Sequence, residues 1–209
     1  MNSGGIRSSI NVGNITLGNV ITVFPFESTI DTLSLSGKFI RESLEKGVSE
    51  FSPAGQFLQV SGLRVTFDVT QDVGSRVVKV QTICKECNED TYDDLDDDEM
   101  YPMITNTYIA NGGDGLTSIS ENKKDYTIGE LDTDVFQDYL AEHKTVLPRT
   151  EGRIRIVTSL TTSAPTISSS ARPQSAPTIS SSTRPQSFLN HFCTSIMKKL
   201  SHGQIFVCG

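Results

Sequence analysis

Apolar and polar residues alternate along several stretches of the chain, and such alternation is typical of strands that bury one face. The stretches are Thr29–Leu35, two segments of Phe57–Val69 on either side of Ser61 and Gly62, and Val77–Ile83. A turn at Asp72–Ser75 precedes the last stretch, so we predict an antiparallel pair there. Tyr101–Tyr108 and Gly152–Val157 are further predicted strands, with Tyr108 at the end of the first.

Segments whose apolar residues have the spacing of a helix lie between these predicted strands. Thr16 is a predicted N-cap for a short helix that ends at Val23, before Pro25. A second predicted helix starts at Gly37, and its apolar residues fall on one face: Phe39, Ile40, Leu44 and Val48. A third spans Asp132–Val146, with Asp132 or Thr133 as its cap. The predicted fold class is therefore α+β, a mixed β-sheet with packed helices.

The composition changes at Ser159. Residues 163–174 and 175–186 are tandem copies of a twelve-residue sequence rich in Ser, Thr and Pro, which cannot build a core. Residues 188–209 contain a short amphipathic pattern that is too short and interrupted for a lipid-anchor signal. We therefore predict a folded domain over residues 1–158, a linker or O-glycosylated stalk over 159–187, and a short amphipathic or disordered tail over 188–209.

The net charge of the predicted domain limits the kinds of molecule that it can bind. Residues 1–158 carry all 25 acidic residues and 14 of the 18 basic ones, a net charge of −11 by difference. We expect no nucleic-acid binding, because phosphate backbones require a basic face. No apolar stretch is long enough to span a bilayer, and the start of the chain lacks the pattern of a signal peptide.

Cysteine and acidic clusters offer two further candidate sites. Cys84 and Cys87 have the spacing of a disulfide, a redox pair or half a zinc site. We favour a structural disulfide, which implies an oxidising compartment, because no ligand pair accompanies the motif and no helix follows it. The acidic run Asp93–Glu99 lacks the glycine and ligand spacing of a helix–loop–helix calcium site, so we interpret it as a solvated loop.

The sequence NTYIANGGDGL at 106–116 combines an aromatic residue with a carboxylate held among glycines. Asp114 is a well-placed acceptor for sugar hydroxyls, and Tyr108 offers a flat face for a base. Near the N-terminus, Gly4 and Gly5 permit close approach of a ligand, and Arg7 offers a planar fork for an anion. The alternatives are a tight surface turn at 106–116 and a flexible N-terminal tail.

Several sequence motifs, taken together, resemble those of one protein family. NSGGIRS, VFPFEST, QFLQVSGLRVTFD, the strand ending in CKEC, NTYIANGGDG and EGRIRI occur in this order. They resemble the C-terminal, substrate-binding domain of 5'-nucleotidases, closest to animal ecto-5'-nucleotidases and salivary apyrases. The resemblance covers residues 2–157. It implies that the strand before Asn2 is missing, so the domain is truncated at its N-terminus.

The resemblance also implies roles for individual residues. Phe26 and Tyr108 match the two aromatic residues that sandwich the base, although Tyr108 stands where animal ectoenzymes usually have Phe. Asp114 matches the carboxylate that accepts the ribose hydroxyls, and Asn2 the asparagine that bonds the base. Arg7 matches an arginine on the ribose and phosphate side. Gly4 and Gly5 match glycines that let the backbone approach the ligand.

In the family, a separate N-terminal domain binds two divalent metals, usually zinc, and performs the hydrolysis. No such metal motif surrounds the three histidines of this chain, so we expect no cofactor and no catalytic residue here. The expected function is the nucleotide-binding half of a hydrolase that converts nucleoside monophosphates to nucleosides. This chain alone is expected to be inactive. The alternatives are a stand-alone extracellular nucleotide-binding module, an apyrase-type relative acting on di- and triphosphates, and a structural protein. An extracellular or surface location and a homodimer are implied by the resemblance.

Overall fold

The computed structural model describes residues 1–51, 55–84, 91–147 and 150–158. It contains a three-stranded sheet in the order β5-β1-β6 and a four-stranded sheet in the order β4-β3-β2-β7. The strands of the first are β1 (Ile30–Ser36), β5 (Met100–Asn106) and β6 (Lys124–Thr127). The strands of the second are β2 (Leu63–Asp68), β3 (Val77–Ile83), β4 (Tyr92–Asp94) and β7 (Ile154–Val157). The α+β class is confirmed, with two sheets in place of one.

Strand pairing is mostly antiparallel. The predicted pair of β2 and β3 is antiparallel and places Leu63 opposite Thr82. The second sheet is mixed because β7 runs parallel to β2. The predicted strand segment before Ser61 is wrong, since that stretch forms only an isolated bridge between Asn2 and Leu58. This bridge attaches the N-terminus of the chain to the segment that leads into the second sheet.

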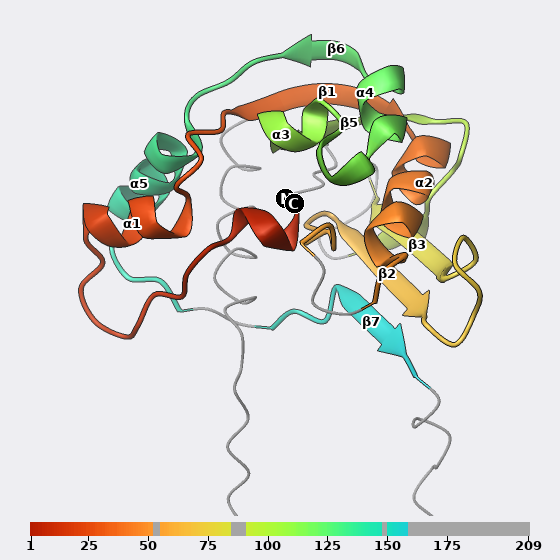
Figure 1. Cartoon of the computed structure of the whole chain (residues 1–209), viewed down its shortest axis with the longest axis horizontal. Helices are drawn as coiled ribbons and strands as arrows, with labels where there is room; N and C mark the ends of the chain where they lie inside the picture. The colour runs from red at the N-terminus through yellow and green to blue at the C-terminus, as the bar shows by residue number, and fades with distance from the viewer. Residues whose placement is uncertain (52–54, 85–90, 148–149, 159–209) are drawn as a thin grey trace, which may run out of the picture.

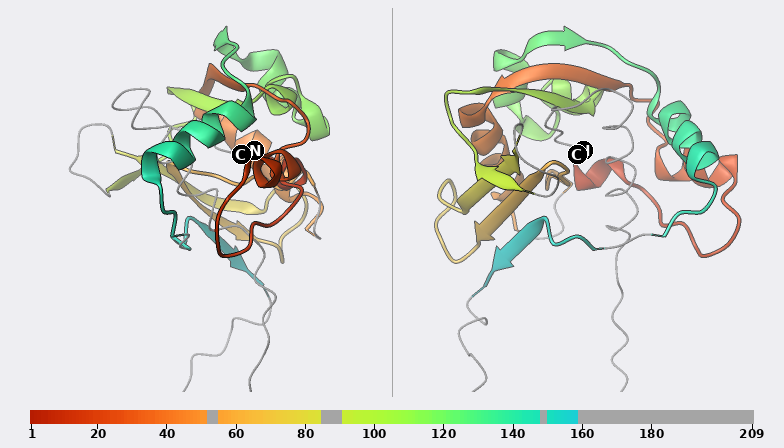
Figure 2. Two further views of the ribbon diagram at one scale, coloured as in Figure 1. Left: turned by 90° about the vertical axis from the view of Figure 1, so that its left-hand side faces the viewer. Right: turned by 180° about the vertical axis from the view of Figure 1, so that it is seen from behind.

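The helices are α1 (Leu17–Val23), α2 (Gly37–Val48), α3 (Thr107–Ala110), α4 (Thr117–Asn122) and α5 (Asp132–His143), with short 3-10 turns η1 (Ser3–Gly5) and η2 (Gly113–Gly115). Figure 1 shows the first sheet above the second, with α2 beside both and η1 between their levels. Helices α1 and α5 lie together at the opposite end (Figure 2). No helix of the described ranges is long and apolar enough to cross a membrane.

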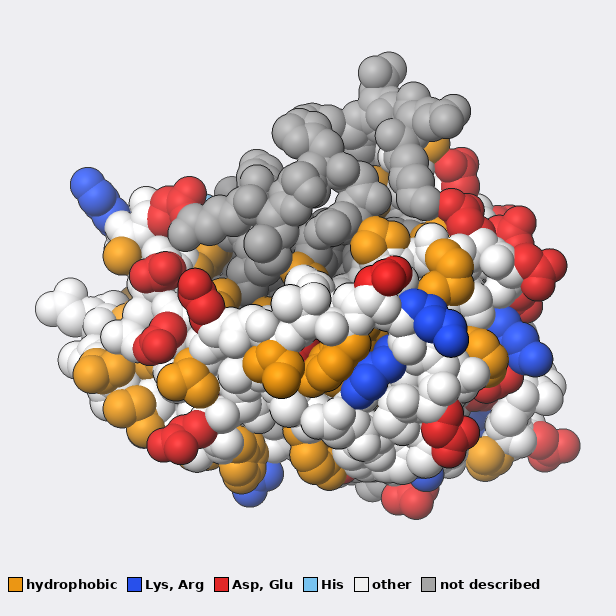
Figure 3. Space-filling model, turned by 90° about the horizontal axis from the view of Figure 1, so that it is seen from above, with side chains coloured by type: hydrophobic (Ala, Val, Ile, Leu, Met, Phe, Trp, Pro, Cys, Tyr) orange, Lys and Arg blue, Asp and Glu red, His pale blue; other side chains and the backbone are white. Residues whose placement is uncertain are grey.

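Two clusters of buried side chains hold these layers together. The larger one joins α2 to both sheets and to α3 and α4, and its fully buried members include Leu35, Val48 and Leu63. The smaller one lies between α1 and α5, where the rings of Phe24 and Phe136 meet edge to face with centroids 5.3 Å apart. The face seen from above carries acidic and basic side chains interspersed with apolar ones (Figure 3).

Two predicted elements differ from the structure at the N-caps of helices. Asn106 ends β5 because its side chain accepts a hydrogen bond from the Ile109 amide and so starts α3. Tyr108 therefore lies in a short helix, and its predicted place at a strand end is wrong. Helix α5 ends at His143, and its N-cap is Leu131, which cannot cap with its side chain. The predicted Asp132 or Thr133 cap is also wrong, whereas the Thr16 cap of α1 is confirmed.

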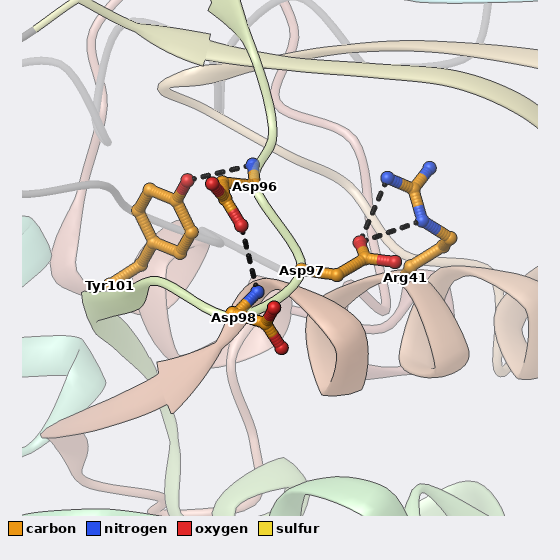
Figure 4. A network of polar contacts seen from close by, with 5 residues as sticks. All are labelled: Arg41, Asp96, Asp97, Asp98 and Tyr101. Carbon is orange, nitrogen blue, oxygen red and sulfur yellow. Dashed lines mark hydrogen bonds and ion pairs between the residues drawn. The ribbon is translucent and has the colours of Figure 1, made fainter.

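The acidic run is exposed, as predicted, but it is more than a solvated loop. It begins in β4, and Leu95 is buried. The carbonyls of Glu99 and Asp97 accept hydrogen bonds from the first amides of α2, at Gly37 and Lys38. The Arg41 guanidinium donates to the Asp97 carboxylate at 3.0 Å (Figure 4). The run therefore satisfies unpaired amides at the N-terminus of α2, where negative charge is also favourable.

Two predictions fall outside the described residues. The first is the disulfide between Cys84 and Cys87, which stays a prediction because Cys87 is not among the described residues. The predicted linker and tail at 159–209 also lie beyond the described ranges.

Candidate functional site

The turn after α3 is folded back onto Tyr108. Gly112, Asp114 and Gly115 have φ values of 85°, 56° and 77°, in the left-handed region. This path brings Asp114 under the tyrosine hydroxyl, which donates to its Oδ1 at 2.8 Å and accepts from its backbone amide at 3.1 Å. The hydrogen bond to Asp114 raises the pKa of Tyr108 above its ordinary value. The hydroxyl therefore stays protonated and holds the carboxylate in one orientation.

Gly113 supports the ring of Tyr108. A Cβ at this glycine would lie 2.6 Å from the ring carbon Cζ, closer than any side chain allows. The backbone of Gly113 therefore packs against the ring at contact distance. The tyrosine is nevertheless 49% exposed. It presents a flat apolar surface that rests on backbone and is available to a planar ligand.

The N-terminal segment approaches the same carboxylate. Asn2 is buried, and its side-chain amide donates to Asp114 Oδ2 at 2.5 Å. Its own Oδ1 has no hydrogen-bond partner within the described ranges. The amides of Ser3 and Gly4 donate to the carbonyls of Phe57 and Gly55, which fixes η1 in place. The alternative of a flexible N-terminal tail is therefore wrong for residues 1–5.

Gly4 and Gly5 leave no room for side chains beside Asn2. A Cβ at Gly4 would lie 3.1 Å from the Cα of Gly55, and one at Gly5 would lie 3.0 Å from the Asn2 Oδ1. Both glycines therefore serve packing around Asn2 in this structure. Any role of theirs in admitting a ligand stays a prediction.

Arg7 and Phe26 form a second part of the site. The Arg7 guanidinium lies 5.7 Å from the centroid of the Phe26 ring and donates to the Gly4 carbonyl at 3.2 Å. Phe26 is 59% exposed. The η1 turn thus connects this pair with the group of Asn2, Tyr108 and Asp114. The structure brings the predicted residues into two groups that share one short turn.

The carboxylate of Asp114 keeps unused acceptor capacity. A carboxylate offers about four lone-pair directions, two on each oxygen. In the described part of the chain, Oδ1 accepts from Tyr108 and Oδ2 from Asn2. Each oxygen can therefore accept one more hydrogen bond. An acceptor of this kind beside an exposed aromatic ring suits a ligand that combines hydroxyl groups with a planar ring.

The described residues around these groups include no cluster of metal-ligating side chains. Within residues 1–51, 55–84, 91–147 and 150–158, no cluster of three or more His, Cys, Asp and Glu side chains could hold a metal ion. The residues at the candidate site therefore do not fit a bound divalent pair, and no reaction step is assigned to a metal here.

Sequence reasoning missed two features near the site. Lys46 of α2 packs against the turn, since a Cβ at Gly115 would lie 2.9 Å from its Cε. Asp31 of β1 is completely buried beneath the start of α3. The signal for Asp31 was available, because it shares the two-residue period of Leu33 and Leu35 on the buried face.

The fold and the site define an α+β domain with two exposed aromatic residues, Phe26 and Tyr108, and a carboxylate acceptor. Residues 1–121 match the family described as 5'-nucleotidase, C-terminal domain. An apyrase from Tabanus yao is 44% identical over 161 residues, which cover 75% of this chain and 29% of that protein. A snake venom 5'-nucleotidase from Macrovipera lebetinus is 35% identical over 159 residues, 74% of this chain and 39% of that protein.

A solved structure has the same fold. The crystal structure of a 5'-nucleotidase precursor from Thermus thermophilus matches with a TM-score of 0.71 and 45% identity. The match covers 76% of this chain and 31% of that one. The chain therefore belongs to the 5'-nucleotidase family and corresponds to its C-terminal domain. It spans less than two fifths of the length of these relatives.

Proposed function

We propose that this chain binds the nucleoside part of a nucleotide and is the substrate-binding half of a 5'-nucleotidase-type hydrolase. The observation that carries the proposal is the Asp114 carboxylate, which is oriented by Tyr108 and Asn2 and keeps one acceptor direction on each oxygen. The two hydroxyls of a ribose supply two donors on neighbouring carbons. Family membership supports the same reading.

The aromatic residues and the amide complete the proposed site. Phe26 and Tyr108 are exposed rings that stack on the two faces of a base. Asn2 is assigned to the edge of the base, as the family resemblance implies, and its buried Oδ1 has no donor in the described structure. Arg7 is assigned to the anionic side of the nucleotide. Gly4 and Gly5 are assigned to the close approach of backbone and ligand.

Calorimetry of the 209-residue chain with adenosine and with 2',3'-dideoxyadenosine tests the role of Asp114. Wild type is expected to bind adenosine about tenfold or more tightly than the dideoxy compound, because hydrogen bonds to a charged group contribute about 1.5–3 kcal/mol. Asp114→Ala is expected to bind both compounds equally weakly. Asp125→Ala is the matched control, since Asp125 also has a positive φ, 48°, and is exposed on β6.

Two results would contradict the proposal. Absence of adenosine binding to wild type would exclude nucleoside recognition by this chain. A preference for adenosine over the dideoxy compound that survives in Asp114→Ala would remove the carboxylate from ribose recognition and leave only the stacking part of the site.

The reaction itself belongs to the proposal for the whole protein. Hydrolysis of a nucleoside monophosphate is assigned to an upstream domain with two divalent metals, so this chain alone is expected to release no phosphate from AMP. The apyrase relative, at 44% identity, favours a second candidate in which di- and triphosphates are the substrates. A nucleotide-binding module without catalysis is the third.

Location, disulfide and assembly are also proposals. The snake venom relative supports an extracellular location, where a disulfide between Cys84 and Cys87 is stable. Residues 159–187 are assigned to a stalk or linker, and residues 188–209 to a tail. A homodimer through this domain is proposed from the family resemblance alone.

A further inference from the structure

A buried carboxylate lies behind the site and has no part in the ligand contacts proposed above. Asp31 in β1 is 0% exposed. Its Oδ1 accepts from the Thr29 hydroxyl at 2.6 Å and from the Gly129 amide at 3.3 Å. Its Oδ2 accepts from the hydroxyls of Tyr126, at 2.6 Å, and Thr107, at 2.9 Å. These four donors fill the capacity of a carboxylate, so Asp31 is saturated without a ligand.

The donors come from separate segments of the chain. Thr29 precedes β1, Thr107 is the first residue of α3, Tyr126 lies in β6, and Gly129 lies between β6 and α5. No ion pair joins Asp31 to a basic side chain within the described residues. A buried charge without a counter-ion is stabilised only by its hydrogen bonds, so the four segments must keep their positions around it.

Two of these donors lie close in the sequence to the two aromatic residues of the site. Thr107 is the neighbour of Tyr108, and Thr29 follows Phe26 by three residues. Thr29 and Thr107 also contact each other directly. Their hydroxyl oxygens are in close contact, and the Thr107 amide donates to the Thr29 carbonyl at 3.0 Å. Asp31 therefore clamps the backbone segments that carry the two rings.

From this arrangement we infer that Asp31 is a positioning residue that sets the separation of Phe26 and Tyr108 through Thr29 and Thr107, and so controls base stacking. The inference rests on the proposed nucleoside site. Asp31 itself is buried and touches no ligand. Its effect on binding passes through the two threonines, and its effect on stability passes through all four donors.

Two single substitutions separate positioning from stability. Thr107→Val and Tyr126→Phe each remove one hydroxyl donor from the same oxygen of Asp31 and keep the side-chain volume. Both variants are expected to unfold at lower temperature. Only Thr107 adjoins an aromatic residue of the site, so only Thr107→Val is expected to alter stacking. Thr107→Ser restores the hydroxyl and serves as the rescue variant.

The probe is 1,N6-etheno-AMP, whose emission is quenched by stacking, titrated into the 209-residue chain. The chain contains no tryptophan to interfere with this emission. Thr107→Val is expected to raise the Kd about five- to tenfold and to reduce the quenching at saturation. This change in Kd corresponds to the loss of about one typical hydrogen bond. Thr107→Ser and Tyr126→Phe are expected to stay within about twofold of wild type, a change below the effect of one typical hydrogen bond.

Each other result overturns the inference. Equal weakening by Thr107→Val and Tyr126→Phe would assign Asp31 to stability alone. Unchanged Kd and quenching in Thr107→Val, with a lowered unfolding temperature, would show that the rings do not depend on this clamp. Failure of wild type to bind both the probe and adenosine would remove the proposed nucleoside site, and the inference with it.

Discussion

Gly113→Ala is expected to displace the Tyr108 ring from its position for stacking while leaving the fold intact. The added Cβ would lie 2.6 Å from Cζ of the Tyr108 ring. Carbon atoms in contact are about 3.5–4.0 Å apart, so the ring must retreat by about 1 Å. The ring is half exposed and can move outward. Gly113 has no positive φ, so alanine fits the backbone conformation itself.

The size of the effect follows from what this movement breaks. The bond from the Tyr108 hydroxyl to Asp114 Oδ1 is 2.8 Å long, and a shift of about 1 Å takes it past the limit of a hydrogen bond. The ring also leaves its position for stacking, which contributes about 1–3 kcal/mol per base in other proteins. Affinity for adenosine is therefore expected to fall about 5- to 150-fold.

Isothermal titration calorimetry with adenosine, together with thermal unfolding, checks this prediction. Gly18→Ala is the matched control, because a Cβ at Gly18 would have Thr16 Oγ1 as its nearest neighbour at an ordinary 3.7 Å. The control should bind adenosine as wild type does. Unchanged affinity in folded Gly113→Ala would refute the reasoning, since the ring would then have moved without affecting the ligand.

Two further predictions concern stability. Asp132 is buried with an unpartnered Oδ1 in the described structure, and burial is the main cause that raises its pKa from 3.8 to about 6. The folded state therefore binds this proton more tightly than the unfolded state, so the contribution of Asp132 to stability is full below about pH 3.9 and is lost as the pH rises through about 6. In urea unfolding at about pH 4 to 8, Asp132→Asn should no longer lose stability as the pH rises, whereas Asp134→Asn, at an exposed position, should lose stability as wild type does. If Asp132→Asn kept the wild-type dependence of stability on pH, the raised pKa would not belong to Asp132. Gly37→Ala should lower the free energy of unfolding by about 1–3 kcal/mol, because its Cβ would lie 2.8 Å from the backbone carbon of Asp96, which cannot move away as a side chain can. A urea midpoint equal to that of Gly18→Ala would disprove this.

The sequence predicted those elements whose burial repeats with a regular period. Helix α2 and strands β1 and β2 each bury one face, and the apolar spacing of each shows this directly. Strand β3 was predicted from its apolar residues, although it buries only Val80 and Thr82. Strands β4 and β6 and helix α4 were missed because three to six residues are too few for a period to be visible. Tyr108 was assigned to a strand because a single capping bond, from Ile109 to Asn106, decides where β5 ends.

The members of the candidate site were named from the sequence, but their mutual contacts were not. The bond between Asn2 and Asp114 joins residues 112 positions apart, and nothing in either local sequence indicates it. The bond between Tyr108 and Asp114 depends on a backbone that enters the left-handed region at Gly112, Asp114 and Gly115. Glycine content permits such a path without specifying it.

The contrast between the two aspartates explains why only one of them suits a ligand. Both carboxylates accept from hydroxyl donors, but Asp31 has four donors and no exposed surface, whereas Asp114 has two and is partly exposed. A saturated buried carboxylate can only fix the segments around it. A half-saturated one at the surface keeps its orientation without a ligand and can accept two further hydrogen bonds. Under the proposed function, folding has already oriented the acceptor, so a ribose that binds Asp114 does not have to order this carboxylate.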